Sequence, residues 1–377
     1  MTTKTDKTQK EFLESKLVEL LYLFGTSGKE ERIQKYLMKE LDSLKTDFVK
    51  MDSYGNIHTQ FTLGSGDGAV LHLNSHMDTV SGVKEDKKIV NDNGVFTAIL
   101  PDGKRGILGA DDRAGIATIL TIINYMPKFD GKLKVSFYRE EEIGCVGSTR
   151  SDKSFLDDVD LSITFDRRGS SDIVVGSFTQ PFACNEVGDW LETLSQANGF
   201  KYKPIEGGIS DAMTVSEHGI NAVNLSVGYY NEHTYNEYLV FSELYTTLEF
   251  ARCIMRDLNK VKYTFTSVPT ENKWIKAWDY KKSSSYGGYY DSSTQRWIDE
   301  EEILANQGFY APVAWVEKDE IAVLSDGAYE MHMNLSELDD LIADLTLARN
   351  LIDANLSLRD FAEVEKELPF LEGLCGN

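Results

Sequence analysis

The sequence lacks the features that mark several classes of protein. Its four cysteines lie far apart and form no Cys-x-x-Cys pair, so neither a zinc ribbon nor a thiol redox motif is predicted. Nothing suggests a disulfide framework, which favours a reducing compartment. No apolar run approaches the roughly 20 residues that a membrane-spanning helix needs, and the polar N-terminal segment does not resemble a signal peptide. We therefore expect a cytoplasmic protein with no membrane partner.

Positive charge is scarce. The chain has 39 Lys and Arg residues against 61 Asp and Glu residues, and its formal net charge is -22 at pH 7. An acidic surface repels nucleic acids and anionic membranes, so neither is expected as a partner. From residue 301 onward, 17 acidic side chains occur with only four basic ones. Carboxylates also bind divalent cations, so the excess is compatible with a metal site.

Hydrophobic periodicity predicts alternating helices and strands. A helical period covers residues 10–45 and is interrupted at 25–28. Within this break, Ser27 is the predicted N-cap of the second helix, and Glu30 is placed to close a capping box. Short apolar runs predict strands at 69–73, 132–138, 161–165, 172–175 and 222–227. Further helices are predicted at 112–125, 186–198 and 242–258. The alternation predicts an α/β fold, a three-layer sandwich around a mostly parallel or mixed sheet.

The pattern changes after residue 262. Residues 263–300 have no clear period, and part of this segment is rich in Ser, Gly and Tyr. This composition predicts a linker or irregular segment. Residues 301–377 are acidic and contain two predicted helices, at 335–352 and 356–368. We therefore expect a main domain over 1–262 and a C-terminal α or α+β appendage over 301–377.

Candidate metal ligands follow the predicted strands. Seven of them lie at the ends of four strands or at the start of one helix: His76, Asp78, Asp112, Glu141, Glu142, Asp166 and His233. The carboxyl ends of strands in an open α/β sheet gather at one edge, which is where such folds bind ligands. Imidazole and carboxylate groups suit zinc, and a carboxylate can bridge two cations that would otherwise repel each other.

Each candidate taken alone has a simpler explanation. An acid at the start of a helix can cap it, a run of acids can be a solvated face, and a histidine can satisfy a loop. The register is also open, because Asp111 adjoins Asp112 and three glutamates occupy positions 140–142. The joint placement of all seven at one sheet edge favours the metal site, since each simpler explanation would need its own cause.

The ordered motifs NSHMDT, GADDRAG, EEIG, FD and NEHTYNE resemble those of the co-catalytic zinc exopeptidases, the superfamily of peptidase T and the bacterial leucine aminopeptidases. The similar stretch runs from Ser27 to Asn259 and includes DSYGN at 52–56 and GGISDA at 207–212. The resemblance implies that residues 1–262 form a catalytic domain that binds two divalent metal ions, most simply zinc. It also implies a short peptide as substrate.

The resemblance assigns a role to each candidate. His76 and Asp166 would bind one ion, Glu142 and His233 the other, and Asp112 would bridge them. Glu141 would be the general base for a metal-bridging water, and Asp78 would fix the tautomer of His76. In this family the bridging aspartate directly precedes the residue that leads into the glycine-containing helix, and Asp112 has that position. The glutamate that binds a metal is followed by any residue and then glycine, and Glu142 has that position. The family also tends to have a cis bond after the bridge, here Asp112–Arg113.

The implied activity is removal of N-terminal residues from short peptides, by an aminopeptidase or a di- or tripeptidase. Only about forty residues separate Asp166 from Gly207, too few for the lid domain of many relatives, and this favours an aminopeptidase over a carboxypeptidase. Arg167 and Arg168 would either anchor a substrate carboxylate or form salt bridges. Tyr229 or Tyr230 is a weaker candidate for an oxyanion donor.

Two alternatives remain open at this level. The same chemistry would serve an amidohydrolase or deacylase of N-acyl amino acids. A non-catalytic metal-binding protein of the same fold would keep the ligands without turnover. A homo-oligomer is also compatible with the sequence, although nothing in it specifies the number of subunits.

Overall fold

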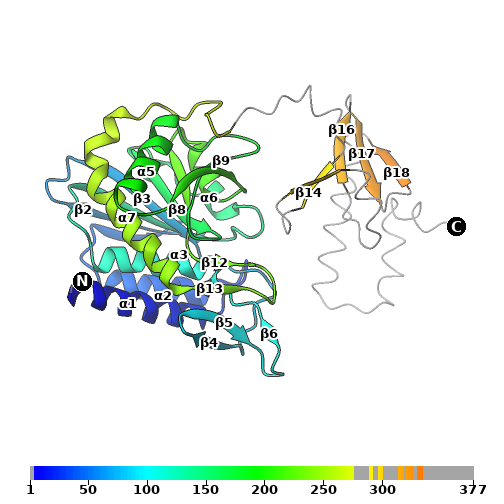
Figure 1. Ribbon diagram of the computed structural model, residues 1–377, viewed down its shortest axis with the longest axis horizontal. Coiled ribbons are helices and arrows are strands. Elements are labelled where there is room, and N and C mark those ends of the chain that lie inside the picture. The colour runs from blue at the N-terminus through cyan, green and yellow to red at the C-terminus, as the bar shows by residue number, and fades with distance from the viewer. Residues whose placement is uncertain are drawn as a thin grey trace. The chain divides into compact units, whose positions relative to one another are not determined.

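The computed structural model describes residues 4–275 and the strands 288–291, 296–299, 313–317, 320–325 and 329–333, with side chains described from residue 8 to residue 275. The chain divides into two compact units, Met1–Trp278 and Asp279–Asn377 (Figure 1). Among the helices of the described residues, none combines the length and apolarity that a membrane crossing requires.

The first unit is built on an eight-stranded mixed sheet. In sheet order the strands are β1 (Phe48–Met51), β2 (Ile57–Leu63), β7 (Gly131–Tyr138), β3 (Ala69–His76), β8 (Leu161–Arg167), β11 (Ala222–Ser226), β9 (Asp172–Ser177) and β10 (Lys203–Gly207). The central strands β7, β3, β8 and β11 run parallel to one another, whereas β2 pairs antiparallel with β7 and with β1, and β9 pairs antiparallel with β11. The mixed central sheet predicted from the sequence is confirmed.

Helices cover both faces of this sheet. They are α1 (Lys4–Leu21), α2 (Glu31–Asp42), α3 (Ala110–Asn124), α4 (Val146–Thr149), α5 (Asn185–Ala197), α6 (Asp211–Ser216) and α7 (Phe241–Val261). Helix α3 packs on β3 and β8, with α1 and α7 against it, while α6 packs on β11, β8 and β3 together with α4 (Figure 1). Every residue of α3 except the last, Asn124, is buried, which explains its nearly all-apolar sequence after the first turn.

A smaller sheet is attached to the main one. Its strands are β12 (Tyr229–Tyr230), β13 (Tyr238–Val240), β5 (Val95–Ile99) and β4 (Lys88–Asp92), with β6 (Arg105–Gly106) paired to β5. Strands β4, β5 and β6 project below the main sheet in Figure 1. The loop between β12 and β13 contains His233, and the chain after β6 leads directly into α3.

One sequence expectation about local structure is wrong, and a segment without clear periodicity contains two strands. The N-cap of α2 is Glu30 rather than Ser27, and it makes no side-chain capping bond. The Ser27 hydroxyl instead donates to Asp78 Oδ2 over 2.7 Å. The segment 263–300, expected to be irregular, contains the antiparallel pair β14 (Gly288–Asp291) and β15 (Arg296–Asp299). Tyr and Trp in these strands have high β propensity, which the Ser- and Gly-rich surroundings obscured.

The second unit contains a further antiparallel sheet of three strands, β16 (Val313–Glu317), β17 (Glu320–Ser325) and β18 (Tyr329–Met333). The helices predicted at 335–352 and 356–368 lie outside the described residues. Three of the four cysteines, Cys145, Cys184 and Cys253, are free and buried. The fourth, Cys375, also lies outside the described residues.

Candidate metal centre

Three parallel strands bring their carboxyl ends to the same edge of the main sheet. His76 is the last residue of β3 and pairs in register with Tyr138, the last residue of β7. Glu141 and Glu142 follow β7 after a short turn, and Asp166 lies near the end of β8. Because parallel neighbours end together, the topology collects residues that are distant in the sequence.

One carboxylate lies between two imidazoles. Asp111 Oδ1 is 2.9 Å from His76 Nε2, and Asp111 Oδ2 is 3.1 Å from His233 Nε2. His233 Nε2 is also 2.8 Å from Glu142 Oε2, and His76 Nε2 is 3.5 Å from Asp166 Oδ1. The five side chains therefore form a continuous chain in which Asp111 occupies the middle.

Asp112 has a different environment from the one expected. Its Oδ1 accepts a hydrogen bond from the Gly115 amide over 3.0 Å, and its Oδ2 accepts one from the Ser75 hydroxyl. The bond from the Gly115 amide caps the regular part of α3, whereas Asp111 lies between the two imidazoles. The cis peptide bond is Asp111–Asp112, not Asp112–Arg113 as expected.

Asp112 nevertheless stays close to the site. Potential ligand atoms of His76, Asp112 and Asp166 all lie within 4.8 Å of one another, as do those of His76, Asp111 and Glu142. The geometry thus brings together every candidate ligand from the sequence, and it adds Asp111 to them.

Asp78 lies behind His76. Its backbone carbonyl is 3.1 Å and its Oδ1 3.3 Å from His76 Nδ1, so Nε2 is the ring nitrogen that faces Asp111. The same carboxylate accepts hydrogen bonds from the amides of Glu141 and Glu142, over 3.0 and 3.2 Å. Asp78 therefore ties the ring orientation of His76 to the backbone of the glutamate turn.

Glu237 links the His233 loop to the start of α3. This fully buried carboxylate accepts hydrogen bonds from the amides of Gly109, Ala110 and Asp111, over 2.7, 2.7 and 3.3 Å. Sequence reasoning did not assign it a role, although it lies within the NEHTYNE motif. A second unassigned acid, Asp211 in GGISDA, is fully buried, and neither of its carboxylate oxygens has a hydrogen-bond partner among the described residues.

The crowded acids strongly affect one another. Burial, and then the neighbouring Asp111, raise the pKa of Glu142 to about 7 and that of Asp166 to about 6. Burial and Asp166 raise the pKa of Glu141 well above its usual value. Burial alone would lower the pKa of His76, but Asp111, Asp166 and Asp78 raise it well above the usual value. A bound cation would therefore stabilise the ionised carboxylates of this cluster.

A small cavity opens onto these residues. Its volume is about 180 Å³. It is lined by Asp111, Glu141, Glu142, Asp166, Arg167, Arg168, Val174, Gly208, Ile209, Asn224, Tyr229, Glu232 and His233. The Tyr229 hydroxyl donates to Asp166 Oδ1 over 3.1 Å, and Asn224 Oδ1 accepts from the Asp166 amide over 2.9 Å. Tyr229 thus buttresses a candidate ligand, while Tyr230 donates to Glu243 over 2.6 Å.

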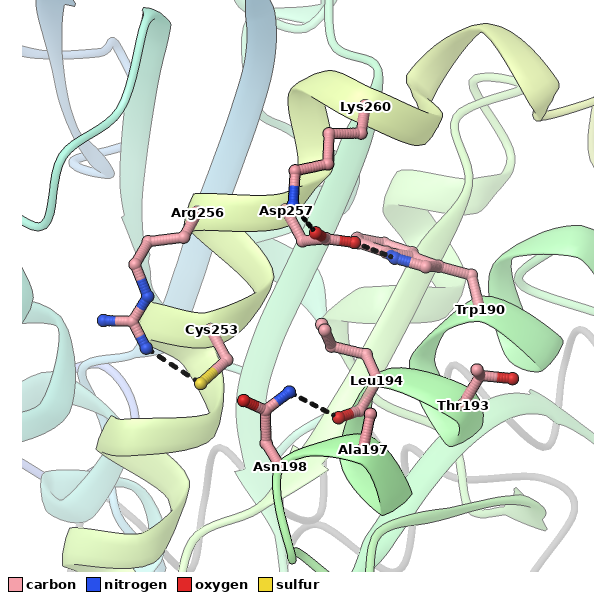
Figure 2. Close-up of a pocket in the computed structure, with 9 residues that line it drawn as sticks. All are labelled: Trp190, Thr193, Leu194, Ala197, Asn198, Cys253, Arg256, Asp257 and Lys260. Carbon is pink, nitrogen blue, oxygen red and sulfur yellow. Dashed lines mark hydrogen bonds and ion pairs between the residues drawn. The ribbon is translucent and has the colours of Figure 1, made fainter.

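A larger hollow, of about 620 Å³, lies between α5 and α7 (Figure 2). Its polar groups are engaged with one another. Asp257 accepts from the Trp190 indole over 3.1 Å and pairs with Lys260, and an Arg256 Nη atom is 2.9 Å from Cys253 Sγ. It contains no histidine and a single carboxylate, so the smaller cavity is the better candidate for chemistry.

Comparison with known proteins agrees with this geometry. Residues 56–245, half of the chain, match the model of peptidase family M28. Peptidase T from Geobacillus thermodenitrificans is 40% identical over 82 residues, and peptidase T from Listeria monocytogenes is 34% identical over 103 residues. These matches cover 21% and 26% of this chain. The chain spans only 20% and 23% of the length of these two relatives.

Solved structures share the fold. Aminopeptidase PepT from Bacillus cereus superposes with a TM-score of 0.58 at 20% identity, covering 66% of this chain and 98% of that one. Aminopeptidase APDkam598 from Desulfurococcus kamchatkensis gives 0.54 at 16% identity, covering 69% and 99%. The α/β architecture and the resemblance to the co-catalytic exopeptidases are thereby confirmed. With the family model matching half of its length, the chain belongs to peptidase family M28.

Proposed function

We propose that the chain is a two-metal aminopeptidase that removes N-terminal residues from short peptides. The single observation that carries the proposal is the position of Asp111 between His76 and His233, with Glu142 and Asp166 at either end. One carboxylate facing two imidazoles is the arrangement that a pair of adjacent divalent cations requires.

The donor set fits such a pair. Imidazole and carboxylate groups are the usual zinc ligands. In the described part of the chain, the buried Glu142 Oε1 has no hydrogen-bond partner, which leaves an oxygen for a cation. We assign His76 and Asp166 to one ion, Glu142 and His233 to the other, and Asp111 to both. When bound, the ions would lower the pKa of an attacking water and polarise the scissile carbonyl.

Glu141 is the proposed general base. Its carboxylate lines the cavity beside the ligands, and its Oε1 accepts only a weak bond from the Cys145 thiol, over 3.4 Å. It can therefore take a proton from the attacking water and deliver it to the departing amine. Asp78 holds the glutamate turn and His76 in position, and it does not itself face the cavity.

Substitution of Glu141 tests this role. Glu141→Gln should retain the metal content of the wild type and lose turnover by about 100-fold or more, because the amide cannot accept the proton. Glu140→Gln is the matched control, since that neighbour is engaged with Tyr54 and Arg139 outside the cavity. Wild-type turnover in Glu141→Gln would contradict the assignment.

A peptide panel tests the activity itself. Zinc-loaded protein would be incubated with short peptides whose termini are free or blocked, and the products identified by mass spectrometry. Loss of N-terminal residues from free-amine peptides alone is the expected result. Cleavage of N-acylated substrates would instead establish the deacylase, and a protein that binds two metals without cleaving any substrate would be the non-catalytic relative.

A further inference from the structure

Two consecutive arginines extend the candidate metal centre along its cavity. Arg167 and Arg168 directly follow Asp166 at the end of β8, and both line the cavity that contains Asp111 and Glu142. A cation at this position has no role in holding metals, because it would repel them. The charge of the arginines is instead directed at anions, either carboxylates of this chain or an anionic ligand in the cavity.

Each guanidinium is held at one edge by a carboxylate. Arg167 Nε donates to Asp172 Oδ2 over 2.9 Å, and Arg168 Nε lies 2.9 Å from Glu232 Oε1. Among the described residues, each of the two arginines pairs with one carboxylate and no more. Because arginine has five N–H donors, donors on the Nη atoms remain for a further anion. The two pairs thus orient the guanidinium groups without using all their donors.

The pair between Arg168 and Glu232 is also loosely made. Arg168 Nε and Glu232 Oε2 are both buried, yet neither makes a well-directed hydrogen bond within the described part of the chain. About a third of the Arg168 side chain is exposed, against 17% for Arg167. The Nη donors of Arg168 are therefore available to a ligand while its Nε stays beside Glu232, and Arg167 is the more buried of the two.

The cavity beside the arginines is small. Its volume of about 180 Å³ is below the roughly 300–1,000 Å³ typical of sites for drug-sized ligands. Val174 and Ile209 supply apolar contacts beside the arginines, and Ile209 is half exposed. A short peptide fits these features, with its reacting carbonyl at the metal ligands and its carboxylate at the guanidinium groups.

We propose that Arg167 and Arg168 bind the C-terminal carboxylate of the substrate, so that the site selects dipeptides and tripeptides with a free carboxyl end. This inference rests on the proposed peptidase function and specifies its substrate class. Longer peptides place the carboxylate beyond the arginines, and amidated peptides lack the charge. Both are therefore poorer substrates, by a KM effect, while the reaction chemistry is unchanged.

The experiment compares a tripeptide with its C-terminal amide, using the full-length, zinc-loaded protein. The wild type should show kcat/KM at least about tenfold higher for the free acid, since a charge-assisted pair is lost in the amide. In Arg168→Gln, the ratio of kcat/KM for the free acid to kcat/KM for the amide should fall toward one, mainly because KM for the acid rises. In Arg168→Lys, which keeps the positive charge, this ratio should be intermediate between those of Arg168→Gln and the wild type.

Arg32→Gln is the matched control, because Arg32 forms an exposed pair with Glu85 and does not line the cavity. It should leave the ratio unchanged. Metal content and melting temperature, measured for each variant, separate a lost anchor from a damaged fold. Equal cleavage of acid and amide by the wild type, or an equal loss of both in Arg168→Gln, would overturn the anchor and leave the peptidase standing. Cleavage of neither peptide by the wild type would overturn the peptidase and the anchor together.

Discussion

At the scale of single residues, two adjacent aspartates have different environments. Asp111 faces the imidazoles of His76 and His233, whereas Asp112 accepts from Ser75 and from the Gly115 amide. The backbone directs neighbouring side chains to different sides, so a shift of one position exchanges a ligand for a helix cap. The two positions can therefore be separated by experiment.

We expect Asp111→Asn to abolish binding of two metal ions, because an amide is a poor bridging ligand. Asp112→Asn should still bind two ions, and its free energy of unfolding should stay within about 1 kcal/mol of the wild-type value, because Asn caps a helix about as well as Asp. Metal analysis after dialysis and urea unfolding would measure both effects. The opposite pattern, with stoichiometry lost only in Asp112→Asn, would restore Asp112 as the bridge.

The sequence indicated where the candidate ligands gather, but not which of the two adjacent aspartates faces the imidazoles. Strand ends followed by His, Asp or Glu predicted which segments meet, because parallel topology forces those ends together. Spacing could not choose between Asp111 and Asp112, since the choice depends on side-chain direction. Glu237 was missed for a related reason, because its three amide partners lie in a segment more than a hundred residues away.

At the scale of elements, β3 has a polar face within the core. All eight of its residues are buried, including His72. The His72 ring lies 2.9 Å from the hydroxyls of both Ser162 and Ser136, on the two neighbouring strands. Burial, and then the nearby His58 and Lys134, lower the pKa of His72 well below its usual value, so the ring is neutral in the folded protein.

This arrangement predicts loss of stability in mild acid. Below about pH 6.5 the unfolded chain protonates His72 while the folded chain does not, so the free energy of unfolding falls as pH falls, until the lowered folded pKa is reached. His72→Gln should reduce this slope by up to about 1.4 kcal/mol per pH unit. Urea unfolding of metal-free wild type and variant between about pH 7 and about pH 5 would measure it. Identical slopes would show that His72 does not contribute.

Central and peripheral elements differed in how well they could be predicted. The buried strands β3, β7 and β8 and the helices α3, α5 and α7 matched the sequence pattern to within a few residues. The strands β1, β2, β4, β5, β6, β10, β12 and β13 were not predicted. They are short or partly exposed, so their apolar runs are too brief for periodicity to reveal.

At the scale of the whole molecule, the chain divides into two units, Met1–Trp278 and Asp279–Asn377. The first unit has a hydrophobic core of its own, from Leu13 to Ile275. All the candidate ligands lie there too. The structure divides after Trp278. The boundaries at residues 262 and 300, which come from the sequence, remain a prediction.

A chain ended after Trp278 should therefore fold cooperatively and bind the same number of metal ions as the full chain. Thermal unfolding followed by circular dichroism, together with metal analysis, would test this. A chain ended after Val240 is the control, since it lacks α7, which packs on α3 and α5. That shorter chain should not unfold cooperatively. Failure of the chain ended after Trp278 to fold would show that the second unit is required for the first.

The order of the ligands along the chain has a consequence during synthesis. His233 is 122 residues beyond Asp111, its partner across the site. Strand β11, helix α7 and the hydrogen bonds from the amides of residues 109–111 to Glu237 must also form before His233 is held in place. A ribosome-bound chain therefore has no assembled reaction centre until most of this unit has emerged. Metal binding at this site would therefore report that the folding of this unit is nearly complete.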